Sequence, residues 1–190
     1  MPRNTVATRK RILTAAYRLF YRRGYVRVTM DDISAAARIT KRSVYYHFKS
    51  KDDLVKAALE DQQAHILSLA QKWVSEPATS PAMLLAEIFG ELRRWVAKPG
   101  WIGSGYTRLA MELADLPGHP ARKIGRQHKR ALEDWLTAQL AVAGARNPEK
   151  LARATSLLME GTMLLVLIHN DPNYASTAQM AAIALAEGEF

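Results

Sequence analysis

The stretch that decides the fold runs from Thr29 to Asp53 and reads TMDDISAAARITKRSVYYHFKSKDD. Thr29, Thr40 and Ser50 each stand where a helix can begin, because a Ser or Thr hydroxyl there can accept a hydrogen bond from a free backbone N–H group. An Asp three residues after Thr29, and again after Ser50, can bond back to the start of its helix or complement the helix dipole. The stretch therefore predicts three helices that begin one shortly after another.

The second of these helices is expected from Lys41 to His47, after a two-turn helix and a tight turn at Arg38. Two short helices joined by such a turn form a helix-turn-helix, whose second helix enters the major groove of DNA. On a helical wheel, Val44 and Phe48 share one face and would pack on neighbouring helices. The side chains that remain exposed suit base edges, thymine methyl groups and phosphates, and they are Arg42, Ser43, Tyr45 and Tyr46.

We expect the DNA contacts to come from this helix, from the turn before it and from the helix starts on either side. The predicted DNA-binding residues are Thr29, Arg38, Thr40, Lys41, Arg42, Ser43, Tyr45, Tyr46, His47 and Lys51. The alternative is a small solvated helix of an all-α protein whose exposed face is basic by chance.

The positive charge of the chain is concentrated around this motif. The net charge is +9, from 27 Lys and Arg against 18 Asp and Glu. Residues 1–50 hold 12 basic and 2 acidic side chains, a balance of +10, which leaves 15 against 16, a balance of −1, for residues 51–190. A basic segment can also bind an anionic membrane or RNA. Its coincidence with a groove-reading motif favours double-stranded DNA as the partner.

The composition is that of a globular chain, with 48% hydrophobic and 24% charged residues. Because cysteine is absent, neither a disulfide framework nor a thiolate metal site is available. The N-terminus lacks the apolar core of a signal peptide. The longest apolar stretch, near Leu164 to Ile168, is shorter than the ~20 residues that a membrane span needs. We therefore expect a cytoplasmic protein that does not bind a membrane.

An amphipathic helix is expected from Thr8 to Arg23, before the motif, and Gly24 would end it. With this helix included, about the first 55 residues resemble the TetR/AcrR (tetracycline-repressor-like) family of bacterial transcriptional regulators. The matching residues are Ile12, Ala16, Phe20, Gly24, Thr29, Ile33, Ala37, Thr40, Ser43, Tyr45, Tyr46, Phe48, Ser50, Lys51 and Leu54. One departure is Arg38, which stands where the family usually has glycine in the turn.

The rest of the chain predicts further helices and no strand. A long helix from Ser50 to Trp73 would link the motif to helices expected over 81–96, 104–116, 121–142, 148–168 and 174–186. The predicted fold class is all-α. An N-terminal three-helix helix-turn-helix head would occupy residues 1–50, and a larger helical ligand-sensing and dimerisation domain would occupy residues 51–190.

The last two helices carry more apolar and small side chains than one buried face requires. They could lie inside the core of one chain or form a two-fold four-helix interface with a second copy. The resemblance favours the second arrangement, because it implies a homodimer joined through its final two long helices. The predicted interface residues are Leu158, Gly161, Leu165, Ala178 and Ala182.

Aromatic and methionine side chains recur through the middle helices, where they could be plain core. The resemblance implies instead a pocket for a small-molecule effector among these helices, and their side chains would suit a largely apolar ligand. The predicted pocket residues are Trp95, Trp101, Tyr106, Met111 and Trp135.

The sequence predicts no catalysis, no cofactor and no metal site. The five histidines lack metal-ligand spacing, and neither a glycine-rich phosphate loop nor a nucleophile elbow is present. We expect a ligand-responsive transcriptional regulator, most simply a repressor that leaves a near-palindromic operator when an apolar molecule binds. The alternatives are an architectural DNA-binding protein without an effector, and an enzyme.

Overall fold

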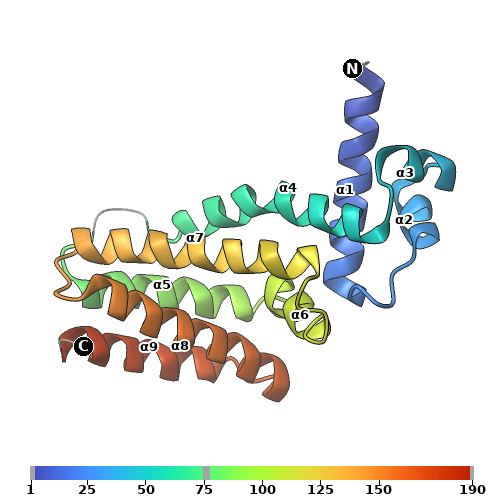
Figure 1. The fold of residues 1–190 in the computed structure, drawn as a ribbon. Helices are drawn as coiled ribbons and strands as arrows, with labels where there is room; N and C mark the ends of the chain where they lie inside the picture. The colour runs from blue at the N-terminus through green and yellow to red at the C-terminus, as the bar shows by residue number, and fades with distance from the viewer. Residues whose placement is uncertain (1–2, 75–77, 189–190) are drawn as a thin grey trace. The chain divides into compact units, whose positions relative to one another are not determined.

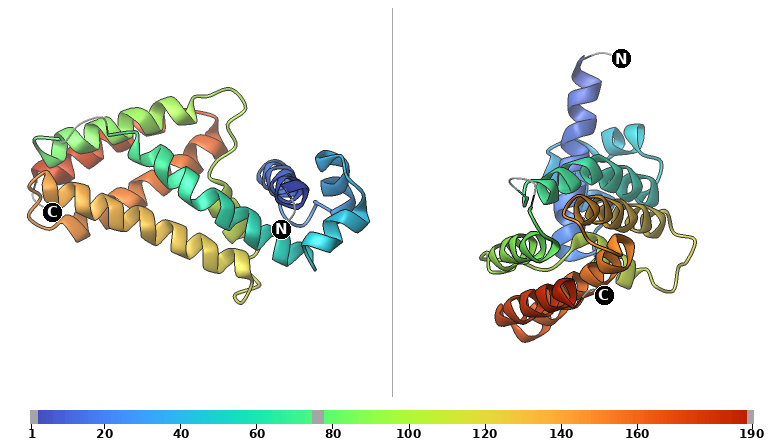
Figure 2. Two further views of the ribbon diagram at one scale, coloured as in Figure 1. Left: turned by 90° about the horizontal axis from the view of Figure 1, so that it is seen from above. Right: turned by 90° about the vertical axis from the view of Figure 1, so that its left-hand side faces the viewer.

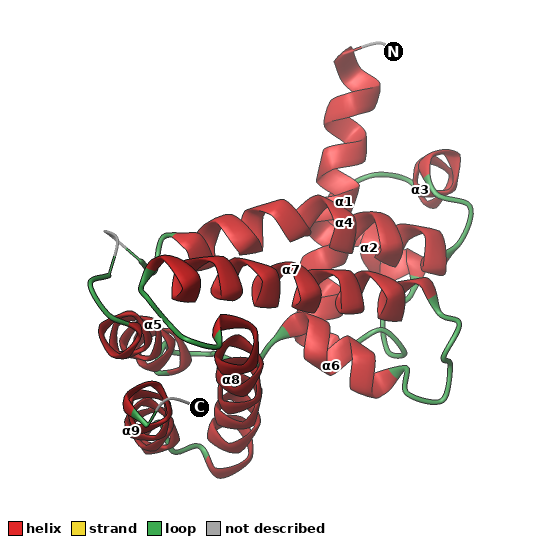
Figure 3. Cartoon of the chain, turned by 60° about the vertical axis from the view of Figure 1, so that its left-hand side comes forward, coloured by secondary structure: helices red, strands yellow, loops and turns green. Residues whose placement is uncertain are grey.

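The computed structural model describes residues 3–74 and 78–188, which form helices and loops without a strand (Figure 3). The predicted all-α class is therefore confirmed. The helices, labelled in Figure 1, are α1 (Arg3–Arg23), α2 (Met30–Ala37), α3 (Lys41–His47), α4 (Lys51–Gln71), α5 (Pro81–Val96), α6 (Gly105–Glu112), α7 (Pro120–Val142), α8 (Pro148–His169) and α9 (Asn173–Glu187).

Contacts within the chain divide it into two compact units. The first unit comprises Met1–Ile66 and Ser104–His128, and the second comprises Leu67–Gly103 and Lys129–Phe190. Helices α4 and α7 each contribute to both units. This division by contacts differs from a division by function, and the functional boundary at residue 50 stays a prediction.

The first unit is built on α1, whose apolar residues recur every three or four positions. Ile12, Ala16 and Phe20 are buried on one face of this helix. Helix α2 packs against α1 and α3 packs against α2. Figure 2 shows this part of the chain from two further sides. Helix α1 begins at Arg3, earlier than the predicted start at Thr8. Because residues 3–8 contain neither Gly nor Pro, nothing in them interrupts the helix.

Helix α6 is fastened to α1 and to α4 by two side chains within this unit. The Tyr106 hydroxyl donates to the carbonyl oxygen of Leu59 at 2.8 Å, and Arg108 Nη1 donates to the carbonyl oxygen of Tyr21 at 2.6 Å. Burial raises the pKa of Tyr106 well above its usual range, so its hydroxyl stays a donor at neutral pH. These two bonds hold α6 at the end of α1.

Glu112 fastens the end of α6 to the loop after α1. Its two carboxylate oxygens accept the backbone N–H groups of Tyr25 at 2.7 Å and Val26 at 2.8 Å. The loop begins at Gly24, whose φ of +82° turns the chain at the end of α1, as predicted, while its N–H donates to the carbonyl of Phe20. A Cβ atom at position 24 would lie 2.8 Å from both Glu112 oxygens, so the residue must be small as well as left-handed.

The second unit is a layer of packed helices in which α5 lies along α9 and α8 lies beside α9 (Figure 1). Large side chains on α5 meet small ones on α9, which lets the two helix axes approach closely. The buried core residues of these two helices include Leu85, Ile88, Phe89, Leu92, Ala175, Ala178 and Ala182. An ion pair between Lys129 and Glu160 joins α7 to α8.

Helix α8 corrects the prediction that no segment is long and apolar enough to span a membrane. Its 22 residues contain an 18-residue window with a mean hydropathy of 1.6. The sequence prediction counted only an uninterrupted apolar run, whereas hydropathy averages over the isolated Thr, Gly and Glu residues of α8. One such helix is weak evidence for a membrane protein, because core helices of soluble proteins have the same composition. Only 39% of this window is buried, so much apolar surface is left uncovered.

Replacing Gly24 by Ala is expected to destabilise the protein. The new side chain would adopt a left-handed backbone conformation, at a cost of about 1–2 kcal/mol, and would also displace the Glu112 carboxylate. Chemical denaturation followed by circular dichroism measures the loss. The matched control is Gly118→Ala, because Gly118 lacks a positive φ and an added Cβ there meets nothing within 4 Å. Equal stability of the two variants would contradict this account of the loop.

Candidate nucleic-acid interface

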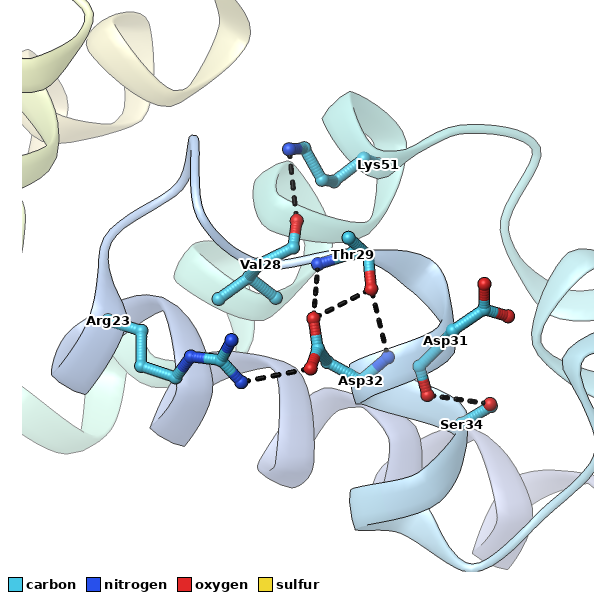
Figure 4. A network of polar contacts seen from close by, with 7 residues as sticks. All are labelled: Arg23, Val28, Thr29, Asp31, Asp32, Ser34 and Lys51. Atoms are coloured by element: carbon cyan, nitrogen blue, oxygen red, sulfur yellow. Dashed lines mark hydrogen bonds and ion pairs between the residues drawn. The ribbon is translucent and has the colours of Figure 1, made fainter.

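The start of α2 is fixed by a reciprocal pair of hydrogen bonds, drawn in Figure 4. The Asp32 N–H donates to Thr29 Oγ1 at 3.1 Å, and an Asp32 carboxylate oxygen accepts the Thr29 N–H at 2.9 Å. Arg23 Nη1, from the end of α1, lies 2.9 Å from the other Asp32 oxygen. The hydrogen bonds from Thr29, and then the Arg23 cation, lower the pKa of Asp32 to about 2, so the carboxylate stays charged at neutral pH. The predicted cap at Thr29 is present.

Lys51, at the start of α4, is tied to the loop between α1 and α2 (Figure 4). Its Nζ donates to the carbonyl oxygens of Tyr25 and Val28, both at 3.0 Å, and lies 4.1 Å from the centre of the Tyr25 ring. The sequence predicted a DNA contact at Lys51 and gave no sign of this structural role. An ammonium group has three hydrogens, so one donor remains for a phosphate, and that contact stays a prediction.

The turn between α2 and α3 is closed by Arg38 in the left-handed conformation, with φ 53° and ψ 49°. A residue with a Cβ atom costs about 1–2 kcal/mol there relative to glycine. Arg11, from α1, braces the turn: its Nη2 donates to the carbonyl oxygen of Ala37 at 2.6 Å and lies 3.3 Å from that of Arg38. The sequence did not predict this role of Arg11, because local sequence patterns do not show a hydrogen bond between residues as far apart in the chain as Arg11 and Ala37.

Helix α3 begins at Thr40, whose hydroxyl oxygen accepts the Ser43 N–H at 3.2 Å, as predicted for a cap. Val44 and Phe48 are buried against the first unit, in agreement with the helical wheel. The guanidinium carbon of Arg9, on α1, lies over the Phe48 ring, 5.1 Å from its centre, in a cation–π contact. The anchored pair of side chains fixes which face of α3 points outward.

The outward face of α3 carries the predicted reading residues. Arg42 is exposed, and Tyr45 and Tyr46 keep 46% and 79% of their accessible surface, which is high for aromatic side chains. Ser43 is half-buried and so is His47, whose ring packs edge-on against Tyr46. A guanidinium, two phenols and a hydroxyl on one short helix offer donors and acceptors to base edges and phosphates.

Lys41 differs from Arg42 in having an ionic partner. Its Nζ lies 2.9 Å from a carboxylate oxygen of Asp31 on α2, and this hydrogen bond raises the pKa of Lys41. Both groups are largely solvent-exposed, so the pair contributes little to stability. Lys41 can exchange this partner for a phosphate, and its DNA contact stays a prediction.

The five predicted pocket residues are divided between the two units. Trp95 and Trp101 lie together in the second unit, with ring centres 5.5 Å apart, and Trp73 lies 6.2 Å from Trp95. Trp135 packs on the same core. Tyr106 belongs to the core of the first unit, where it stacks on His128, and Met111 in the same unit is 60% exposed. Spacing along the chain could not tell these two environments apart.

The predicted interface residues also differ in their surroundings. Leu165 is 37% exposed, and a Cβ added at Gly161 would meet nothing within 4 Å, so both lie at an open face of α8. Leu158 is half-buried against the core. Ala178 and Ala182 are buried against the other helices of the second unit, at 8% and 1% exposure. This burial leaves them little surface for a partner chain, and their place in the interface stays a prediction. The more exposed apolar residues Leu157, Leu164, Ile168 and Met180 were not among the predicted interface residues.

Within residues 3–74 and 78–188, no group of three or more His, Asp or Glu side chains is arranged to hold a metal ion. The buried His119 has another use, because its Nδ1 accepts the backbone N–H of Ala121 at the start of α7. A cavity of about 280 Å³ lies in the second unit between the end of α5 and the end of α8. Trp101, Lys98, Val166 and Asn170 are among the residues that line it.

Comparison with known proteins identifies relatives of the N-terminal segment. Residues 12–58 match the family model of the bacterial regulatory proteins of the tetR family. The HTH-type transcriptional regulator TtgR of Pseudomonas putida is 38% identical over 89 residues, which are 45% of this chain and 42% of TtgR. The HTH-type transcriptional repressor KstR2 of Mycolicibacterium smegmatis is 33% identical over 88 residues, which are 46% of this chain and 42% of KstR2. The chain thus matches less than half the length of either regulator.

Solved structures extend the similarity over most of the chain. A TetR transcriptional regulator from Streptomyces avermitilis superposes with a TM-score of 0.77 at 29% sequence identity, covering 92% of this chain and 97% of the other. The matched segment contains the capped α2, the turn and α3, and the likeness of fold includes the later helices. The chain therefore carries the N-terminal domain of the tetR family of bacterial regulatory proteins, and its fold matches that of a solved TetR regulator over most of its length.

Proposed function

We propose that this chain is a DNA-binding transcriptional regulator that reads its operator with α3. The observation that carries the proposal is the exposed face of this helix, where Arg42, Tyr45 and Tyr46 project from a helix anchored by Val44 and Phe48. Positive charge on residues 1–50 supplies attraction to phosphates, and the side chains of α3 supply the reading of bases. Because the relatives are transcription regulators, we infer a binding protein and not an enzyme.

We infer that the chain acts as a homodimer, with α8 in the interface. Leu157, Leu164 and Ile168 are spaced by seven and four residues, so they follow one stripe along α8, and they are 71%, 41% and 62% exposed. Large exposed apolar patches on proteins mark interaction sites, so we expect a partner to cover this stripe. Gly161 lies between them and allows close approach of another helix. Two copies related by a two-fold axis would present two α3 helices to a near-palindromic site.

We further propose that the dimer is a cytoplasmic repressor released by a small, largely apolar effector. The second unit offers a cluster of Trp73, Trp95 and Trp101 and the adjoining cavity of about 280 Å³, close to the lower end of the size of known ligand sites. A repressor role is supported by the similarity to KstR2. The effector can change DNA affinity only through a conformation that it binds better than the operator-bound one.

Arg42→Ala and Tyr45→Ala should each cost roughly 1–3 kcal/mol of binding to the preferred operator and relax the sequence requirement there. The operator is obtained by selecting bound fragments from random DNA pools, and affinities are then measured by fluorescence anisotropy. Arg130→Ala, an exposed arginine on α7, is the matched control and should leave both quantities unchanged. If Arg42→Ala and Tyr45→Ala left affinity and sequence preference intact, α3 would not be the reading helix.

Leu164→Glu should convert the dimer to monomers, because the substitution buries an unpaired charge in the interface. Sedimentation velocity measures the change, and operator affinity should fall with it. Val142→Glu, at a position of α7 that is 72% exposed, controls for adding an acid to an exposed apolar residue. A Leu164→Glu chain that remains a dimer of wild-type affinity would place the interface elsewhere. Recovery of the wild-type chain in a membrane fraction would instead assign α8 to the bilayer.

An effector found by screening apolar aromatic compounds against tryptophan fluorescence should bind the operator-loaded protein more weakly than the free protein. Thermodynamic linkage requires that operator DNA weaken effector binding by the same factor by which saturating effector weakens operator binding. Each ~1.4 kcal/mol of coupling free energy corresponds to a tenfold change in either affinity. Titration of both forms measures it. A compound that binds both forms equally would contradict the release mechanism. That result would leave the proposed DNA binding intact and would agree with an architectural DNA-binding protein.

A further inference from the structure

The turn between α2 and α3 contains an arginine where a smaller residue would serve the backbone better. Arg38 has a positive φ of 53°, a conformation that glycine adopts without steric strain and that asparagine tolerates. A backbone role alone therefore gives no reason for arginine at this position. Conformations of this kind persist where the surrounding structure enforces them, and they concentrate at functional sites.

The surrounding structure does enforce this conformation, through Arg11 on α1. The Arg11 guanidinium donates to the carbonyl oxygen of Ala37 and reaches that of Arg38. These carbonyls belong to the C-terminal end of α2, where free acceptors and the helix dipole favour a cation. The brace holds the backbone of Arg38 while leaving its side chain free to point outward.

The Arg38 side chain is exposed, and within the described residues no acid neutralises it. The segment from Thr29 to Phe48 contains two acids, and each already has another partner. Asp31 pairs with Lys41, and Asp32 pairs with Arg23. The turn therefore carries an unpaired guanidinium beside the bracing Arg11, and an anion that approached it would meet an uncompensated positive charge.

We propose that Arg38 binds a phosphate of the DNA backbone and that Arg11 is the positioning residue that fixes it next to the reading helix. The inference rests on the proposed DNA-binding function and adds a contact that sets register and affinity without reading sequence. Guanidinium groups suit phosphates because their paired N–H donors match two phosphate oxygens. The left-handed turn is the structural condition for this contact.

The test compares Arg38→Gly, Arg38→Asn and Arg38→Lys with the wild type, on the selected operator and on a random-sequence duplex, from about 50 to 200 mM salt. The Gly and Asn variants should weaken binding to both duplexes by a similar factor, about fivefold near 0.15 M salt. They should also reduce the slope of log affinity against log salt by about 0.9, as expected for one lost phosphate contact. Arg38→Lys should restore most of the slope.

Unfolding midpoints keep this result separate from a folding defect. Arg38→Gly should unfold at the same or a higher denaturant concentration than the wild type, because it removes the strain of the turn. Wild-type affinity and salt slope in Arg38→Gly would overturn the proposal. So would a loss confined to the operator, which would indicate a base contact. A wild-type chain that binds neither duplex would overturn the proposed function itself, a result distinct from either of these.

The role of Arg11 is tested by Arg11→Met in two backgrounds, the wild type and the Arg38→Gly variant. In the wild type, the substitution should weaken DNA binding, because the phosphate contact is no longer held in place. In the Arg38→Gly variant, it should weaken binding much less, since no side chain remains to be positioned. Equal losses in both backgrounds would overturn the positioning role and indicate that Arg11 contacts DNA itself.

Discussion

The loop between α1 and α2 must have its backbone polar groups satisfied, and side chains from distant parts of the chain do this. Glu112 accepts two of its N–H groups, and Lys51 donates to two of its carbonyl groups. An unsatisfied backbone group in a partly buried loop costs about as much as a lost hydrogen bond. The direction in which α2 leaves α1, and with it the orientation of α3, depends on these four bonds.

Charge pairing on α2 complements this arrangement. Its first turn carries two acids, which suit the positive end of the helix dipole, and each is matched by a cation from outside α2. The acids near α3 therefore do not neutralise Arg42, which faces outward with two phenols. Because both acids of α2 already have ionic partners, Arg42 can bind an anionic partner without first breaking an ion pair.

Local sequence signals made the helix-turn-helix predictable, whereas the long-range hydrogen bonds that support it could not be predicted. The caps at Thr29 and Thr40 and the inward positions Val44 and Phe48 follow from spacing within one or two helical turns, and the structure contains them. Helical periodicity also gave the all-α class. The bonds of Arg11 and Glu112 join residues far apart in the chain, which a single sequence does not pair.

The second unit shows the same limit for the faces of its helices. Alanines on α9 suit a tight interface between two chains and equally a tight contact within one chain, and Ala178 and Ala182 are buried within the chain. Tyr106 and the tryptophans looked alike as pocket residues, but the chain folds them into different units. Composition indicates that a side chain is buried, whereas the neighbour against which it is buried follows from the tertiary fold.

The close contact of Glu112 with Gly24 constrains how this sequence can change. An added Cβ at position 24 would meet the Glu112 carboxylate, so even a residue that tolerates a positive φ, such as Asn, fits there only after residue 112 has been shortened or has lost its bonds to the loop. The order of the two substitutions therefore matters. If position 24 changes first, the intermediate protein is destabilised; if position 112 changes first, the intermediate has a loosened loop. The two positions are expected to vary together among descendants of this chain, although most of the first unit's sequence separates them.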